Sequence, residues 1–147
     1  MNTTVNVYLT FKGECKEAFD FYKSVFGGEY SNIATFGEMP SQADMPPVPD
    51  EEKDKIMHIA LPISKETMLM GSDISGEWAK TFKKGNNFSI SVNTTRKRDA
   101  DRIFNKLSDG GKIMMPMDNT FWGSYFGMFT DKFDVNWMVS FELPGQS

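Results

Sequence analysis

Residues 5–28 read VNVYLTFKGECKEAFDFYKSVFGG, and they carry the signals of a strand followed by a helix. In residues 5–11 apolar and polar side chains alternate, which is typical of a half-buried strand. The next apolar side chains recur at helical spacing, and they are Ala18, Phe19, Tyr22, Val25 and Phe26. Two glycines, Gly27 and Gly28, then supply a C-terminal stop for the helix.

The same order of signals returns in the second half of the chain. Residues 87–93, NFSISVN, alternate again, and residues 99–111, DADRIFNKLSDGG, carry a helical stripe that ends in a second pair of glycines. Each helix is followed by three short β-like runs: YSNIATF, KIMHIALPI and TMLMGS, then GKIMMPM, SYFGMFT and NWMVSFE. The repeat predicts an α+β fold, a single domain of 147 residues made of two βαβββ modules, residues 1–73 and 86–143.

Composition and charge narrow the classes of partner. Sixteen basic and 20 acidic side chains give a net charge of −4, and the basic cluster at residues 95–101, TRKRDAD, contains acids, so we expect no nucleic-acid partner. No run approaches the roughly 18 apolar residues of a membrane span, and no signal peptide is recognisable, so we expect a soluble protein. The single cysteine, Cys15, excludes an intrachain disulfide and favours the cytoplasm.

Two stretches lack periodic patterns. Residues 73–87, DISGEWAKTFKKGNN, are polar and contain glycine, which is typical of a linker. Residues 37–55 contain four prolines and many acids. This stretch is too long for a plain turn, and it is either a mobile lid over a site or a disordered loop.

The alternation divides each strand into an apolar face and a mixed face. Ile59, Leu61 and Ile63 share one face, for example, whereas His58 and its neighbours two residues along share the other. The apolar faces are expected to pack against the helices. The opposite surface then collects Asn6, Tyr8, His58, Ala60, Asn87, Ser89, Ser91, Asn136 and Met138. If the sheet curves, this surface is a cleft.

Six stretches of the chain carry a resemblance to a known family. They are YLTFKGECKEAFDFYKSVFGG, IMHIALPI, MLMGSD, GNNFSISVN, GGKIMMPM and TFWGSYFGMFTDKFDVNWMVS. Together they look like the PhnB-like subgroup, described as 3-demethylubiquinone-9 3-methyltransferase, of the vicinal-oxygen-chelate superfamily, which includes glyoxalase I, extradiol dioxygenases and bleomycin-resistance proteins. The resemblance implies a curved mixed sheet around a cleft and a homodimer. It does not bring a methyl-donor site, because the sequence offers no strand, glycine-rich turn and helix in that order.

Metal-dependent members of the superfamily hold a divalent ion with four ligands, typically His, Gln or Glu. The resemblance implies that these positions fall on Asn6, Ala60, Asn87 and Met138. None is a good ligand for such an ion. A two-residue shift yields Tyr8, His58, Ser89 and Asn136, of which only His58 is a plausible ligand. We therefore predict no metal site and no cofactor.

Candidate site residues follow from the mixed face and from the family positions. His58 is the candidate general base, since imidazole titrates near neutral pH, and the alternative is a structural histidine. Asp73 could orient His58 or bind a ligand amine, or it could cap a turn. The candidate ligand-binding residues are Tyr8, His58, Asp73, Phe121, Trp122, Tyr125 and Met138. The three aromatic residues from 121 to 125 suit a flat apolar ligand, and they equally suit core or dimer contacts.

Three functional hypotheses remain open at this point. The first is a metal-free homodimer that binds a small, partly aromatic or apolar molecule in its cleft. The second is an enzyme, either a lyase, isomerase or dioxygenase with atypical metal ligands or a metal-free catalyst that uses His58 as its base. The third is a dimeric module whose aromatic face binds a protein partner.

Overall fold

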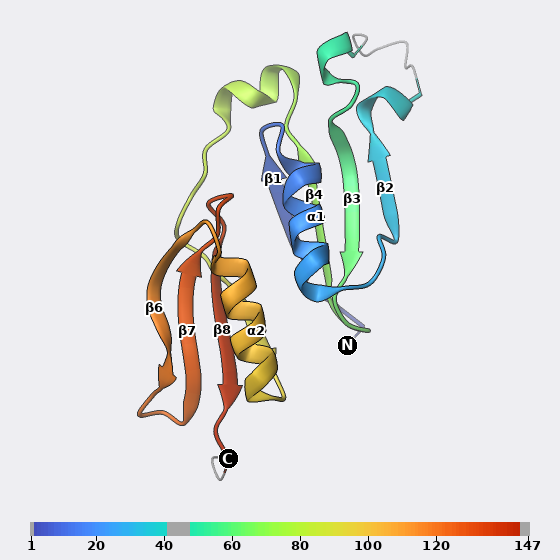
Figure 1. The fold of residues 1–147 in the computed structure, drawn as a ribbon. Helices are drawn as coiled ribbons and strands as arrows, with labels where there is room; N and C mark the ends of the chain where they lie inside the picture. The colour runs from blue at the N-terminus through green and yellow to red at the C-terminus, as the bar shows by residue number, and fades with distance from the viewer. Residues whose placement is uncertain (1, 41–47, 145–147) are drawn as a thin grey trace. The chain divides into compact units, whose positions relative to one another are not determined.

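The computed structural model describes residues 2–40 and 48–144, which fall into two compact units, Met1–Lys83 and Lys84–Ser147. Each unit contains one α-helix and one four-stranded mixed sheet (Figure 1). The predicted α+β fold with two βαβββ modules is confirmed. No helix in the described part of the chain is both long enough and apolar enough to cross a membrane.

The first unit follows the predicted order of elements. It contains β1 (Val7–Phe11), α1 (Cys15–Phe26), β2 (Asn32–Thr35), β3 (Ile56–Pro62) and β4 (Met68–Asp73), with the short 3-10 helices η1 (Phe36–Glu38), η2 (Asp50–Glu52) and η3 (Gly76–Thr81). The strands lie in the order β1-β4-β3-β2. The β1–β4 pair is parallel, and the other two pairs are antiparallel.

The second unit repeats this topology. It contains β5 (Ile90–Thr94), α2 (Lys97–Ser108), β6 (Lys112–Asn119), β7 (Ser124–Thr130) and β8 (Asn136–Glu142), with the strand order β5-β8-β7-β6. Again the first and last strands, β5 and β8, are parallel neighbours. At the outer edge, β6 pairs with β7 in a register that shifts twice along the strand.

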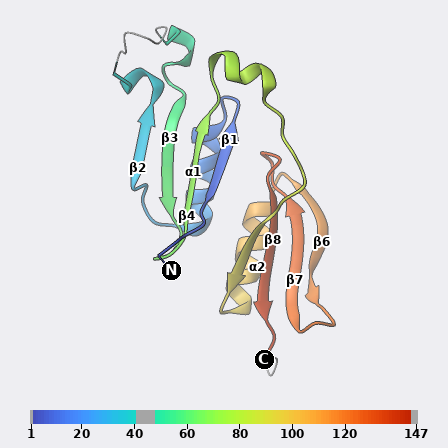
Figure 2. The same ribbon diagram turned by 180° about the vertical axis from the view of Figure 1, so that it is seen from behind.

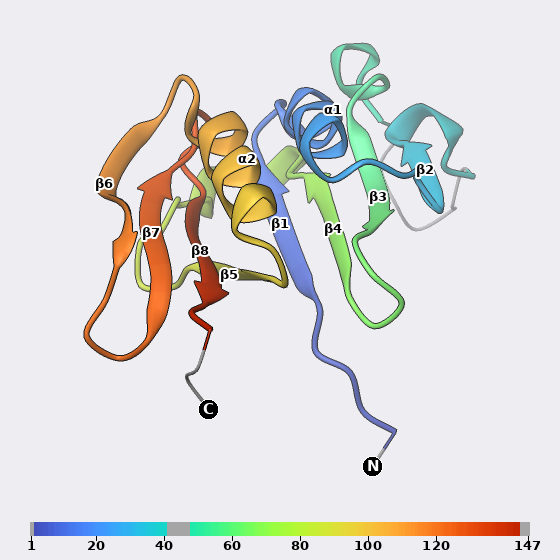
Figure 3. The same ribbon diagram turned by 60° about the horizontal axis from the view of Figure 1, so that its bottom comes forward.

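In each unit the helix covers one face of its own sheet (Figures 1 and 3). Four of the five residues of the stripe predicted for the first helix are buried, since Ala18, Phe19, Tyr22 and Val25 lie in the core with Leu9, Phe11, Ile59 and Leu61 of the sheet. The fifth, Phe26, is half-buried. The second helix buries Ala100, Ile103, Phe104 and Leu107 with Phe129, Trp137 and Val139. From behind, each sheet is seen in front of its helix, so its second face carries no helix (Figure 2). We call this second face the open face.

Element boundaries differ from the predicted ones at several points. The strand predicted over residues 87–93 begins only at Ile90, and Phe88 is exposed instead of packed with Ile90 and Val92. Val5 is likewise exposed, because β1 begins at Val7. The predicted linker contains the 3-10 helix η3. Residues 41–47 lie outside the described residues, so the prediction of a lid or of a disordered loop over residues 37–55 stays a prediction.

Candidate functional site

On the open face of the first sheet, four paired positions form a row across the strands. The register pairs Tyr8 with Met70, Met70 with Ala60, and Ala60 with Asn32. Side chains at paired positions point to the same face of a sheet. Tyr8 is exposed, whereas the small Ala60 is only 2% exposed. The predicted cleft residue Tyr8 therefore does lie on the open face.

His58 lies beside this row on β3 and contacts two of its members. Its Nδ1 is 2.6 Å from the amide nitrogen of Asn32, and its ring centroid is 6.0 Å from that of Tyr8. An amide nitrogen can only donate, so Nδ1 accepts and the ring proton is on Nε2. Nε2 is then the nitrogen of the ring that can donate a hydrogen bond to a ligand. This arrangement suits ligand binding better than proton abstraction.

Asp73, the second polar candidate of this unit, lies at the end of β4 on the opposite face. Its register partner is the core residue Phe11, and the Asp73 side chain is only 4% exposed. Oδ1 accepts hydrogen bonds from the backbone nitrogens of Gly13 (2.9 Å) and Cys15 (3.0 Å), and Oδ2 accepts one from that of Ile56 (2.9 Å). The structure does not bring Asp73 to His58. Its contacts instead tie the turn before α1 and the start of β3 to the end of β4.

Cys15 lies beside this carboxylate at the first position of α1. Its side chain is fully buried. Burial, and secondarily the negative charge of Asp73, raise the pKa of the Cys15 thiol far above its ordinary value. The thiol is therefore protonated and is no candidate nucleophile.

The open face of the second sheet is rich in methionine. The register places Ser91 beside Met138, Met138 beside Met128, and Met128 beside Met115. Three flexible thioethers thus lie side by side, and we call Met138, Met128 and Met115 the methionine row. Such side chains adapt to apolar groups of different shape. Met138 is therefore on the face where the sequence predicted it.

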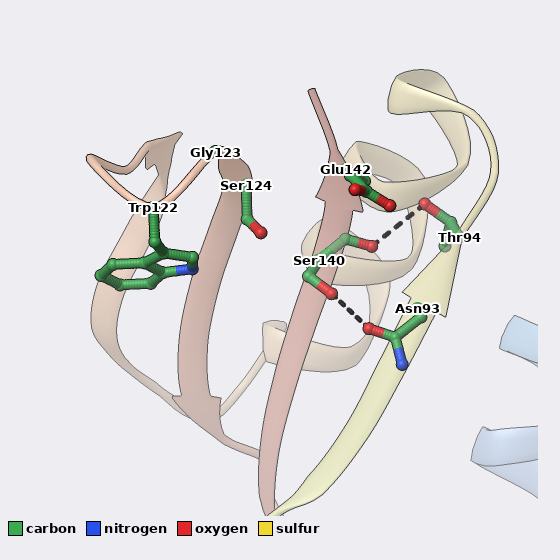
Figure 4. A pocket seen from close by; sticks show the side chains of 7 residues that line it. All are labelled: Asn93, Thr94, Trp122, Gly123, Ser124, Ser140 and Glu142. Atoms are coloured by element: carbon green, nitrogen blue, oxygen red, sulfur yellow. Dashed lines mark hydrogen bonds between the residues drawn. The ribbon is translucent and has the colours of Figure 1, made fainter. Parts of the chain in front are cut away.

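One end of this open face is hollowed into a cavity of about 280 Å³ (Figure 4). It is lined by Asn93, Thr94, Trp122, Gly123, Ser124, Ser140 and Glu142. The Ser140 hydroxyl donates to Asn93 Oδ1 (2.5 Å), and the Thr94 hydroxyl donates to the Ser140 carbonyl oxygen (3.3 Å). These bonds join β5 to β8 at the cavity. Because Ser140 lies two residues beyond Met138 on β8, the cavity adjoins the methionine row.

Trp122 forms the aromatic wall of the cavity. It stands in the turn between β6 and β7, where Gly123 adopts a φ of 95°. Phe121 and Phe126 meet the indole edge to face, at centroid distances of 5.1 and 5.8 Å. The indole is 53% exposed and Phe121 is 98% exposed. Trp122 therefore offers a positioned ring to a ligand, whereas Phe121 lies outside the cavity lining.

Tyr125 does not join Trp122. It is paired with Phe141 of β8 and its hydroxyl donates to Asp101 Oδ1 of α2 at 2.5 Å, so it lies on the helix face. The ammonium group of Lys97 is 4.8 Å from the centroid of the Tyr125 ring. The hydrogen bond to Asp101, followed by desolvation, raises the pKa of Tyr125 to about 12. This contact fixes α2 on its sheet.

Asp131, in the turn between β7 and β8, is a buried carboxylate with a structural role. Oδ1 accepts from the backbone nitrogens of Phe133 (2.8 Å) and Val135 (3.1 Å), and Oδ2 accepts from the indole nitrogen of Trp137 (2.8 Å). The three bonds shape the turn and anchor the largest buried side chain of the unit.

The four positions that the resemblance implies for metal ligands are unsuited to that role in the structure. Asn6 precedes β1 and accepts from the Met68 nitrogen (3.0 Å), and Ala60 is buried and apolar. Asn87 lies outside β5. Ser91 pairs with Met138 in the second unit as Tyr8 pairs with Met70 in the first. Two residues before each, Ser89 is therefore the counterpart of Asn6. Among residues 2–40 and 48–144, no three or more His, Cys, Asp or Glu side chains are grouped to hold a metal ion.

Several cavity residues were not among the candidates from the sequence. Asn93 and Glu142 continue the alternation that placed Ser91 and Met138 on the mixed face, Asn93 directly after Ser91 and Glu142 after Met138 and Ser140. Following that alternation to the strand ends would have found both. The turn residues Gly123 and Ser124 carry no such periodic signal.

Comparisons with known proteins agree with this architecture. Residues 3–140 match the model of the family described as 3-demethylubiquinone-9 3-methyltransferase. The protein YjdN of Escherichia coli (strain K12) is 32% identical over 139 residues, which cover 90% of this chain and 91% of YjdN. The crystal structure of PA1353 from Pseudomonas aeruginosa shares 40% identity at a TM-score of 0.81, over 97% of this chain and 99% of that chain. A glyoxalase/bleomycin resistance protein/dioxygenase family enzyme from Burkholderia phytofirmans PsJN shares the fold alone, with a TM-score of 0.61 at 12% identity over 94% of this chain and 97% of that chain.

Proposed function

The chain belongs to the 3-demethylubiquinone-9 3-methyltransferase family and has the fold of a glyoxalase/bleomycin resistance protein/dioxygenase family enzyme, and on that premise we propose that it is a small-molecule-binding protein. The observation that carries the proposal is the cavity of about 280 Å³ on the open face of the second sheet. Ligand sites in proteins combine a concave surface with an aromatic wall and a few convergent polar groups. Trp122 supplies the wall, and Asn93 and Ser140 are two of the polar groups.

The surroundings of the cavity define the kind of molecule. A volume of about 280 Å³ accommodates one functional group with a small body rather than a large cofactor. The adjoining methionine row provides an adaptable apolar surface for the remainder of the ligand. The ligand is therefore partly polar and partly apolar.

Methyl transfer, which the family description names, is not part of the proposal. Doubly wound sheets bind their cofactors in the crevice outside the carboxyl ends of parallel strands, beside a glycine-rich turn that opens a helix. In each unit of this chain only one of the three strand pairs is parallel. The topology is therefore not that of a doubly wound sheet.

A second candidate function rests on His58 and its neighbours. The imidazole of His58 lies on an open face with Asn32 and Tyr8, so it can donate from Nε2 to a bound carbonyl and act in metal-free acid–base chemistry. This function requires one additional step, in which Nδ1 of His58 leaves the Asn32 amide and accepts from a substrate instead. Replacement of His58 by Gln separates the two candidates, because ligand binding at the Trp122 cavity is expected to survive it.

The assembly and the location of the protein belong to the proposal as well. The family resemblance supports a homodimer, and the single, buried Cys15 supports a reducing compartment such as the cytoplasm. Sedimentation velocity of the purified chain tests the first statement directly.

A thermal-shift screen tests the binding function. Protein treated with a chelator is mixed with a library of small amphipathic molecules, and a ligand that binds the native state raises the melting temperature. The expected result is at least one ligand whose effect is lost in Trp122→Leu, while Phe88→Leu, a change at another exposed aromatic residue, leaves it intact. A library without a single stabilising member, or stabilisation that always requires a divalent metal, contradicts the proposal.

A further inference from the structure

The cavity beside Trp122 carries an unbalanced charge. Among the described residues that line it, Glu142 is the one ionisable group, and no lysine, arginine or histidine accompanies it. A concave site with charge of one sign concentrates ligands of the opposite sign. The net charge of the whole chain, −4, acts in the same direction. The cavity therefore favours cations over anions.

Two of the three hydroxyl groups in the cavity, those of Ser140 and Thr94, present acceptors to a ligand. The proton of Ser140 is used in its bond to Asn93 Oδ1, and the proton of Thr94 is shared between the carbonyl oxygens of Ser140 (3.3 Å) and Arg96 (3.0 Å). A hydroxyl that has donated its proton keeps lone pairs for accepting. With the carboxylate of Glu142, the cavity offers two kinds of acceptor oxygen, hydroxyl and carboxylate, and a ligand group that donates several hydrogen bonds matches them.

The aromatic wall fits the same ligand group. Two edge-to-face neighbours, Phe121 and Phe126, hold the indole of Trp122, and tryptophan is the strongest aromatic partner for a cation. In Figure 4 Trp122 lies on one side of the cavity and Thr94 and Asn93 lie on the other, with Ser124, Ser140 and Glu142 between them. A cationic group can thus contact the indole and the carboxylate within one small space.

We propose that the cavity binds a small organic cation, in which an ammonium or guanidinium group is attached to a flat apolar body. The cationic group lies between the Trp122 indole and the Glu142 carboxylate and donates to the Ser140 and Thr94 oxygens. The apolar body extends along the methionine row. This inference rests on the proposed function and names the chemical class of its ligand.

Three naphthalene derivatives that differ mainly in charge test the inference by isothermal titration calorimetry. They are 2-naphthylmethylammonium, the neutral 2-naphthylmethanol and the anionic 2-naphthoate. We expect the cation to bind at least about tenfold more tightly than the alcohol, because one charge-assisted contact at a partly exposed site is of that order. The naphthoate is expected to show no binding, and added salt is expected to weaken the binding of the cation selectively.

Two variants with the same change in net charge locate the effect. Removing one carboxylate by Glu142→Gln or by Glu66→Gln takes the net charge from −4 to −3, but Glu66 lies in the first unit, outside the cavity. Glu142→Gln is expected to weaken the cation about tenfold and to leave the alcohol nearly unchanged. Glu66→Gln is expected to leave both affinities unchanged. Glu142 is exposed, so its variant should retain the wild-type melting temperature, which is measured alongside.

The outcomes separate the inference from the function on which it rests. Equal affinities for the cation and the alcohol, or a loss of cation binding that is the same in Glu66→Gln, overturn the inference and leave a binding protein of another ligand class. Absence of binding by all three compounds overturns the inference too. The proposed function itself falls only if the library screen also yields no stabilising molecule.

Discussion

Replacement of Asp73 by asparagine is expected to destabilise the first unit by about 3–4 kcal/mol. In the folded protein the buried carboxylate accepts from the backbone nitrogens of Gly13, Cys15 and Ile56 at 2.9–3.0 Å. An asparagine can keep its oxygen toward the first two nitrogens, but its NH₂ group then faces the N–H of Ile56. Losing one charge-assisted hydrogen bond costs about 2 kcal/mol, and a buried N–H without an acceptor adds about 1–2 kcal/mol.

The assay is urea unfolding followed by far-UV circular dichroism, with Asp54→Asn as the matched control. Asp54 is exposed, and its replacement should change the free energy of unfolding by less than about 0.5 kcal/mol. If Asp73→Asn also stays within about 1 kcal/mol of the wild type, the three backbone contacts do not carry the stability assigned to them. In that case the carboxylate would again be a candidate for ligand binding.

Three further predictions concern packing, pH and thiol chemistry. Gly71→Ala should lower the free energy of unfolding by about 1–3 kcal/mol, because the added Cβ would lie 2.7 Å from the Leu9 carbonyl oxygen and 2.8 Å from the Phe19 ring. The control is Gly85→Ala, where the nearest atom is 3.6 Å away. Equal unfolding midpoints of the two variants would refute the packing argument. Absorbance at 295 nm should show Tyr125 ionising near pH 12, and Tyr125→Phe should remove that step. Because the pKa of Tyr125 is raised in the folded state, its contribution to stability is complete below about pH 10 and is lost as the pH rises toward 12. A wild-type titration that is complete by pH 11 would be inconsistent with the Asp101 contact. Cys15 should react with a thiol reagent only after unfolding, and rapid labelling of the native protein at neutral pH would contradict its burial.

Periodicity predicted the elements of this fold better than their ends. The helical stripe of Ala18, Phe19, Tyr22 and Val25 is buried as predicted, since the spacing of apolar residues along a helix is a local property. Phe88 continues the alternation of β5 but is exposed, because the first paired residue of that strand is Ile90, opposite Trp137. Strand ends are set by hydrogen-bonding partners distant in the sequence, which alternation does not report.

The candidate site shows the same division between local and distant information. The alternation of side chains along the strands correctly placed Tyr8, His58 and Met138 on open faces. By contrast, the contact of His58 with Asn32 spans 26 residues, and that of Tyr125 with Asp101 spans 24. The partners of such side chains are fixed by the strand order, so their chemistry became visible only in the folded chain.

The exposed edge strand β6 has a consequence for the solubility of the protein. Almost all of its residues are exposed, including Ile113, Met114 and Met115, and a regular edge of this kind would be a template for pairing with other chains. Two features oppose such pairing. The register of β6 against β7 shifts between Ile113 and Met115 and again between Met115 and Asp118, and Pro116 has no N–H to offer an incoming strand. The proline and the irregular register thus disfavour the addition of another chain to this apolar edge of the sheet.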